Sequence, residues 1–170
     1  APDADPLIFP ANTPVLIAGS RTEAAKLGLT GTLPDAIDSI FDQIGAVVIV
    51  VRVEEGASEA ETLANVLGGV DANTGQYEGV HAFVAAENIT GFVPKIFIAP
   101  GFTHTRTSDT ANPVVAELSG IADRLKAVII ADGPNTNDAD AIAYAGDFGS
   151  KRIYVVDPKS KKTGTDGTTI

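Results

Sequence analysis

Cysteine, methionine and tryptophan are absent from this chain of 170 residues, and histidine occurs only twice. The absence of cysteine excludes disulfide bonds, thiol catalysis and cysteine-ligated metal sites. Neither His81 nor His104 has a second histidine or a carboxylate at a ligating interval in the sequence. We therefore expect no metal site and no cofactor.

Basic residues are also scarce, because 12 Lys and Arg stand against 22 Asp and Glu, for a formal net charge of −10. A surface this acidic repels phosphate backbones, so we expect no nucleic-acid partner. The longest apolar run, residues 46–51, is too short to span a bilayer, and we expect no membrane partner. No signal-peptide pattern is present. The missing initiator methionine favours a processed chain or one cut from a longer polypeptide.

Five short, continuously apolar runs predict β-strands, since each is ended by turn residues. Continuous apolarity, as opposed to alternation, indicates that both faces of a strand are covered, which is typical of parallel strands. The predicted strands are residues 14–18, 46–53, 95–99, 127–131 and 152–156.

Helix-period segments with start signals lie between these runs. Ser58 with Glu61 predicts a capping box, and the other expected N-caps are Thr32, Asn112 and Asn137. The helices that follow are expected to end near residues 45, 68, 125 and 149, with shorter helical patches at residues 23–27 and 80–87 and a hairpin-like loop at 71–79.

Strands that alternate with helices predict an α/β fold with a mostly parallel sheet of about five strands and helices on both faces. Residues 1–158 are expected to form a single domain. Residues 159–170, which carry Lys159, Lys161 and Lys162, are interpreted as a polar loop or linker that is cut part-way.

Ligand sites in α/β sheets lie beyond the carboxyl ends of the strands. There, Ser20, His104 and Asp132 suggest a hypothetical nucleophile, base and orienting carboxylate. Local roles are favoured instead, because Asp132 precedes Gly133 and Pro134 as turn-forming residues do, and no nucleophile-elbow motif is present. The prediction is that catalytic, cofactor-binding and metal-binding residues are all absent.

Other charged residues receive similar local interpretations. Asp138 and Asp140 fall in the first turn of a predicted helix, where negative charge favours the helix dipole. Glu54 and Glu55 end a strand and are expected to form a solvated corner. Arg52 interrupts the longest strand, and two readings stay open: pairing with Glu54 or Glu55, or facing a partner subunit.

An ordered series of blocks resembles the tail sheath proteins of contractile-tailed bacteriophages and the related R-type pyocins. The series covers residues 9–17, 31–33, 42–46, 50–53, 55–56, 59–62, 65–69, 98–103, 112–118, 131–136 and 147–150. Single blocks such as IAPGFT or ADGPNT are unspecific, but their order along nearly the whole chain indicates the family.

This resemblance implies a virion structural protein, assembled in the host cytoplasm, and not an enzyme. Sheath subunits stack as six-membered rings around a tail tube and contract on a baseplate signal, which drives the tube through the host envelope. The expected partners are other sheath subunits, the tube protein and the baseplate, whereas the segment alone is expected to be monomeric. Arg21, Arg106 and Arg124 are candidate contact residues by type only. The alternative is a hydrolase-like or small-molecule-binding domain with its pocket at the strand ends.

Overall fold

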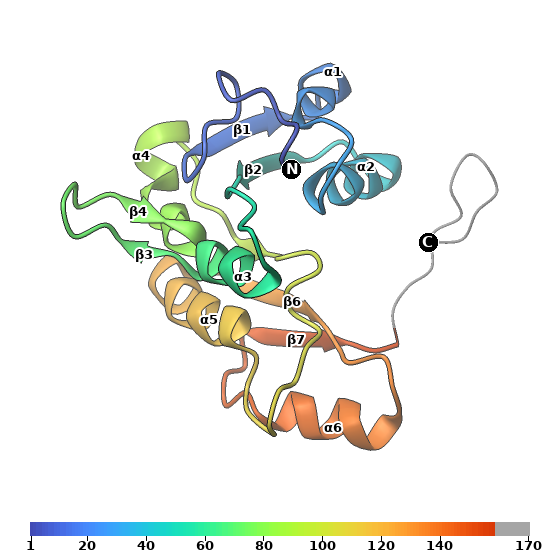
Figure 1. Cartoon of the computed structure of the whole chain (residues 1–170). Helices are drawn as coiled ribbons and strands as arrows, with labels where there is room; N and C mark the ends of the chain where they lie inside the picture. Colours follow the sequence, from blue (N-terminus) through green and yellow to red (C-terminus); the bar gives the residue numbers. More distant parts are fainter. Residues whose placement is uncertain (159–170) are drawn as a thin grey trace.

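The computed structural model describes residues 1–158, which fold into two neighbouring layers of helices and short strands (Figure 1). The first half contains β1 (Pro14–Ala18), α1 (Arg21–Ala24), η1 (Ala25–Leu27), α2 (Leu33–Gln43), β2 (Val47–Val51), α3 (Glu59–Leu67), β3 (Gly69–Val70) and β4 (Tyr77–Glu78). The second half contains η2 (Gly79–Ala85), α4 (Ala86–Thr90), β5 (Ile96–Phe97), α5 (Pro113–Leu125), β6 (Val128–Asp132), α6 (Asp138–Gly146) and β7 (Ile153–Val156). The expected tail at residues 159–170 lies outside the described residues.

The five predicted strands all form, but they divide between two sheets, so the prediction of one mostly parallel five-stranded sheet is wrong. β1 pairs antiparallel with β2 in a two-stranded sheet of their own. β5, β6 and β7 form a three-stranded sheet that is parallel throughout. A continuous apolar run reports that both faces of a strand are covered, but it carries no information on strand direction.

The polar loop expected at residues 71–79 is the turn of a short hairpin, because β3 pairs antiparallel with β4. Within the turn, the Asp71 carboxylate accepts backbone N–H bonds from Asn73 at 2.9 Å and from Thr74 at 2.6 Å. An aspartate that bonds its own following backbone is a common way to stabilise a tight turn. The expected hairpin-like excursion is confirmed.

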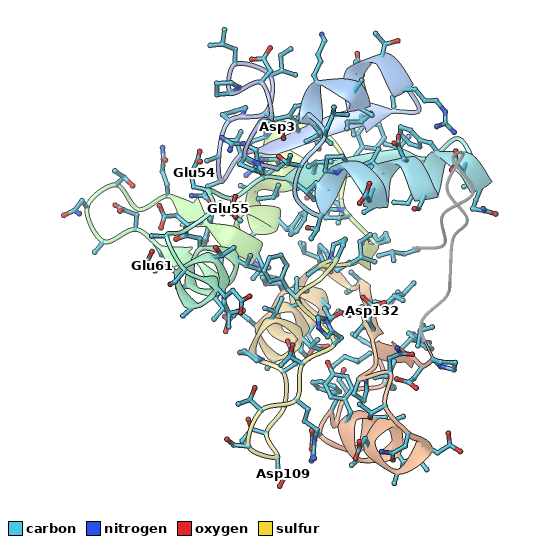
Figure 2. All side chains as sticks on the ribbon, turned by 45° about the vertical axis from the view of Figure 1, so that its right-hand side comes forward. Asp3, Glu54, Glu55, Glu61, Asp109 and Asp132 are labelled. Atoms are coloured by element: carbon cyan, nitrogen blue, oxygen red, sulfur yellow. The ribbon has the colours of Figure 1, made fainter. Side chains whose placement is uncertain are left out.

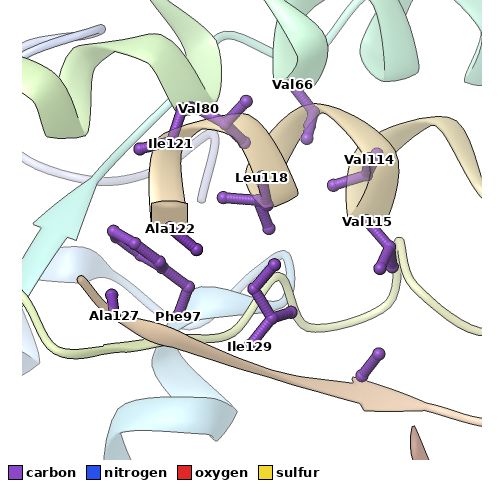
Figure 3. Close-up of a cluster of buried hydrophobic side chains, with 11 residues drawn as sticks. Val66, Val80, Phe97, Val114, Val115, Leu118, Ile121, Ala122, Ala127 and Ile129 are labelled. Carbon is purple, nitrogen blue, oxygen red and sulfur yellow. The ribbon is translucent and has the colours of Figure 1, made fainter. Parts of the chain in front are cut away.

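The larger core lies between α5 and one face of the β5–β6–β7 sheet (Figure 3). Leu118 and Ala122 project from α5 toward Phe97 and Ile129 of the sheet, while Val66 and Val80 lie on the other side of α5. Val114, Leu118, Ile121 and Ala122 of α5 are all buried, because residues at helical spacing share one face.

A second core lies between α2 and the β1–β2 sheet, and it also covers η1. Its fully buried side chains are Phe9, Ile17 and Leu27, with Ile37 and Phe41 contributed by α2. Ile44 is 67% exposed, because α2 ends at Gln43, slightly before the end near residue 45 that the sequence predicted.

Three of the four predicted helix caps act through their side chains. Ser58 accepts from Glu61 N–H at 3.2 Å, Asn112 from Val114 N–H at 2.9 Å and Asn137 from Asp140 N–H at 3.0 Å. Thr32 occupies the cap position of α2 without a side-chain cap bond. These caps satisfy backbone donors that a helix leaves without intrahelical partners. None of the helices within residues 1–158 is long and apolar enough to cross a membrane.

Candidate functional site

The three residues of the hypothetical triad do not share one sheet edge. His104 follows β5 and Asp132 is the last residue of β6 in the three-stranded sheet, whereas Ser20 follows β1 in the other sheet. Ser20 caps α1, because its hydroxyl accepts from the backbone N–H of Glu23 at 3.2 Å. The structure therefore gives Ser20 the local role that the sequence favoured.

Asp132 bonds to Thr103 in the described structure. The Asp132 backbone N–H donates to the Thr103 hydroxyl oxygen at 3.0 Å, and this hydroxyl lies 3.4 Å from the Asp132 carboxylate. His104 has a buried Nδ1 atom with no hydrogen-bond partner within the described residues. The carboxylate-to-imidazole bond that orients a catalytic base is thus not formed by Asp132 and the Nδ1 atom of His104.

Tyr144 of α6 is the residue at this edge that sequence reasoning missed. It is fully buried, its phenol donates to the carbonyl of Thr103, and its ring packs edge-on against Phe148 with 5.0 Å between ring centroids. Burial raises the pKa of Tyr144 to about 12, with the carboxylates of Asp132 and Asp147 adding to the shift. The phenol therefore stays protonated near neutral pH and acts as a donor. The sequence feature that could have indicated this buried residue is that Tyr144 is the single aromatic side chain in the alanine-rich helix α6.

Arg106 holds the loop that follows β5 against the end of α6. Its guanidinium reaches both oxygens of Asp147, at 2.6 and 3.0 Å, and contacts Asp109 at 2.6 Å. Hydrogen bonds from Arg106 lower the pKa of Asp147, and the same pair raises the pKa of Arg106. Figure 2 shows Asp109 at the tip of this loop. A bidentate pair of this kind fixes the direction of both side chains.

Asn112 completes the anchoring of the same loop. Its side chain is 2% exposed, accepts from the N–H groups of Val114 and Val115, and donates to the carbonyls of Phe102 at 3.0 Å and Thr105 at 2.9 Å. Buried amides that use all of these bonds specify one backbone path. The polar residues at this edge are therefore arranged to hold a loop in place.

The second arginine of interest, Arg52, is buried directly after β2, against the segment that precedes β1. Its side chain is 5% exposed; the Nε donates to the carbonyl of Phe9 at 2.8 Å, and the guanidinium pairs with Glu54 at 2.7 Å. Of the two readings left open for Arg52, the structure supports pairing with Glu54.

The two remaining contact candidates differ in their surroundings. Arg21 pairs with Asp42 at 2.9 Å on the surface, between α1 and α2. Arg124 is exposed in the last turn of α5. Surface pairs such as that of Arg21 contribute little to stability and can be exchanged for others.

Among the remaining acidic and histidine candidates, Asp140 and His81 have partners within the described residues. Asp138 and Asp140 stand in the first turn of α6, where Asp140 accepts from Thr136 and Asn137 at 2.7 Å each. His81 lies 2.8 Å from Glu117, a contact between η2 and α5 that the sequence spacing did not reveal. No group of three or more metal-ligating side chains occurs within residues 1–158.

Glu54 and Glu55 lie in the segment between β2 and α3, and Glu61 lies in the first turn of α3 (Figure 2). Glu61 accepts from the backbone N–H of Ala57 at 2.7 Å, one residue before the bond expected of a capping box. Glu54 is 63% exposed beside Arg52. Glu54 and Glu55 are both exposed and form the solvated corner that the sequence predicted.

An apolar cleft separates the two sheets. Its volume is about 390 Å³, and it is lined by α2, β2, η2 and the segment that follows β5. Ile37, Val50, Phe83, Ile98 and Phe102 line it from these elements. Sequence reasoning missed this cleft, because it arises from the division of the strands into two sheets.

Comparison with known proteins finds one family model and three relatives, all described as tail sheath proteins. Residues 1–53 match the family model described as tail sheath protein Gp18 domain III N-terminal region. The chain is 34% identical over 147 residues to a prophage major tail sheath protein of Pseudomonas aeruginosa strain UCBPP-PA14, covering 86% of this chain and 36% of the relative. It is 37% identical over 166 residues to the tail sheath protein of Escherichia phage P2, covering 93% and 40%.

A third relative, the major tail sheath protein of Serratia phage KSP20, is 35% identical over 162 residues, covering 93% of this chain and 39% of the relative. The chain thus spans about two fifths of the length of the curated relatives it matches.

Proposed function

Since this chain belongs to the tail sheath family of contractile-tailed phages, we propose that it is the structural part of a sheath subunit that polymerises around a tail tube and contracts. Contraction would drive the tube through the host envelope. The observation that carries this proposal is the similarity to three tail sheath proteins over 86 to 93% of the chain.

The tail sheath family is structural, so the expectation that the chain is not an enzyme is confirmed by its relatives, and the hydrolase-like alternative has no support. The described geometry fits a structural role. The polar residues that follow β5 and β6 bond to loop backbone and to one another, as Thr103 does with Asp132 and Asn112 with Phe102. Groups used in this way hold a rigid shape that can transmit force through contacts.

We further propose that residues 1–158 act as one α/β body within a longer sheath polypeptide, in keeping with the greater length of the relatives. Its partners would be other sheath subunits in six-membered rings, the tail tube and the baseplate. The protein would be assembled in the host cytoplasm and reside in the virion. The acidic surface supports contacts that are partly electrostatic, since such contacts can be exchanged without exposing large apolar patches.

Electron microscopy of the longer sheath polypeptide beside this chain tests the proposal. We expect hollow sheaths from the longer protein and monomers from the 170-residue chain. The control is the longer polypeptide that carries both Arg52→Met and Leu118→Ala. Both residues are buried, so this variant should form fewer sheaths and gain no new activity. A longer protein that stays monomeric in the presence of tube protein would contradict the proposal.

A further inference from the structure

The β5–β6–β7 sheet has one face packed against α5 and an opposite face that the described residues leave uncovered. Five apolar side chains lie on this opposite face, which we call the bare face. Their exposed fractions are 61% for Ile96, 41% for Ile98, 39% for Ile130, 57% for Tyr154 and 43% for Val156.

The strand register makes the bare face continuous. Ile130 of β6 lies opposite Tyr154 of β7, and Ile96 of β5 lies opposite Val128 of β6. The alternate residues of the same strands, Phe97 and Ile129, are at most 2% exposed against α5. Because side chains alternate between the faces of a strand, this sheet is apolar on both faces but covered on only one.

Chain order explains why the second face is uncovered. The three strands lie in the sheet in their sequence order, without a reversal of direction. Right-handed crossovers between strands in this order carry their helices to the same face. A helix reaches the opposite face only after the strand order reverses, and parallel sheets are almost always covered on both faces. The prediction of helices on both faces is therefore not met within residues 1–158, although the pattern that led to it is present in the strands.

We infer that the bare face is the docking surface for an amphipathic helix contributed by the part of the sheath polypeptide that lies outside this segment. This inference rests on the proposed function, because the curated relatives are about two and a half times as long as the segment they share with this chain. Three strands spaced about 4.8 Å apart present a width comparable to one helix of about 10 Å diameter. Ile98 lies both on the bare face and at the apolar cleft, so the uncovered surface continues toward β2.

A neighbouring sheath subunit is the less favoured occupant. If the proposed contraction takes place, contacts between subunits rearrange, and a rearranging contact at this surface would expose a wide apolar sheet face to water. A helix of the same polypeptide would cover the face permanently. The covering segment should therefore protect the bare face in the unassembled subunit as well as in the sheath.

Cysteine labelling measures this protection directly, because the chain contains no cysteine of its own. Single Ile130→Cys and Tyr154→Cys variants report on the bare face. The matched controls are Ile129→Cys, at a fully buried position of the same strand, and Ile142→Cys, at a position of α6 that is 73% exposed. The rate of maleimide addition is measured in the 170-residue chain, in the unassembled longer polypeptide and in assembled sheaths.

In the 170-residue chain, the Ile130→Cys and Tyr154→Cys variants should react at rates close to that of Ile142→Cys. In the unassembled longer polypeptide, both should react at least about tenfold more slowly, toward the rate of Ile129→Cys, because the thiol then reacts only after local opening. Within the longer polypeptide, the rates of Ile130→Cys and Tyr154→Cys can be compared with those of Ile129→Cys and Ile142→Cys. This comparison does not require the 170-residue chain to fold on its own.

Protection that arises only in assembled sheaths would assign the bare face to a neighbouring copy and overturn the inference. Equal, fast labelling in all three states would overturn it as well. Protection in a longer polypeptide that forms no sheath would support the inference while the proposed function fails, so the two proposals fail independently.

Discussion

At the residue scale, the Asp3 carboxylate joins the N-terminal segment to the loop that follows η1. It accepts from the N–H of Leu29 at 2.8 Å and of Thr30 at 3.1 Å, and also from the Thr30 hydroxyl. These bonds lower the pKa of Asp3 to about 2, the Leu29 backbone bond contributing most. Asp3 is exposed near the start of the chain and is labelled in Figure 2.

The lowered pKa of Asp3 predicts a pH-dependent contribution to stability. An unfolded aspartate has a pKa of about 3.9, so between this value and about 2 the unfolded chain binds more protons. The stabilisation is complete above pH of about 4 and is lost as the pH falls through the folded value. Urea unfolding from pH 7 to 2 measures the gap in the free energy of unfolding between the wild type and Asp3→Asn. This gap should narrow only as the pH falls from about 4 to about 2. A constant gap for Asp3→Asn over the whole pH range would contradict the assignment.

The buried guanidinium of Arg52 predicts a larger effect of substitution. Arg52→Met keeps much of the side-chain length but removes the bonds to the Phe9 carbonyl and to Glu54. Buried hydrogen bonds from a charged group contribute about 1.5–3 kcal/mol each, so we expect a loss of about 2–3 kcal/mol in the free energy of unfolding. Denaturant unfolding measures it. Arg124→Met, at an exposed site, should change stability by less than about 0.5 kcal/mol; equal effects of the two substitutions would show that burial of Arg52 is not what matters.

At the scale of secondary-structure elements, Gly79 forms the tight junction between β4 and η2. It has a φ of +57°, and a methyl group added there would overlap the backbone carbonyl of Val66 in α3. Its N–H also donates to the Asn12 side chain at 2.9 Å, which ties this junction to the segment before β1. The close approach of α3 to this junction therefore requires glycine.

Gly79→Ala and Gly120→Ala form a matched pair of predictions. Gly79→Ala should destabilise by at least about 2 kcal/mol, because a left-handed conformation costs about 1–2 kcal/mol without glycine and the overlap adds to it. Gly120 lies in α5 with open space around it, so Gly120→Ala should stabilise by about 0.5–1 kcal/mol. Thermal unfolding followed by circular dichroism would reveal the opposite signs. A neutral Gly79→Ala would mean that α3 can move away without cost.

At the scale of the whole molecule, the described chain has two cores and a strong charge imbalance. One core lies under α5 and the other under α2, with the apolar cleft between them. The two halves nevertheless touch, since the N–H of Gly79, at the start of η2, donates to the Asn12 side chain at 2.9 Å. The net charge of −10 adds repulsion that acts across the whole body.

This repulsion predicts that salt stabilises the chain. Raising sodium chloride from low concentration to about 0.15 M shortens the Debye length to about 8 Å and should raise the melting temperature by a few degrees. Differential scanning fluorimetry across a salt series measures the slope. Asp38→Lys, which brings the net charge of −10 two units closer to neutrality, should reduce that slope. A melting temperature that falls with salt would show that specific ion pairs outweigh the overall repulsion.

The strands and helix caps that depend only on residues within one short segment were predicted correctly from the sequence. The strand at residues 14–18 and the cap of α5 by Asn112 depend only on nearby residues, and the structure confirms both. Thr103 and Tyr144 were not foreseen as partners, because 41 positions separate them in the chain and neither belongs to a recognisable motif. For Arg52, the sequence left open pairing with a neighbouring glutamate or facing a partner subunit. The choice depends on whether the side chain is buried, which the sequence does not reveal.

The sequence by itself determined which segments form strands and helices, where most helices begin, and the protein family. Each of these follows from short-range patterns or from the order of residues along the chain. The tertiary structure decided that β1 and β2 pair antiparallel, that they stand apart from the parallel sheet, and that one face of that sheet is bare. Strand direction and helix placement depend on contacts between distant segments, and an apolar run reads the same in either direction.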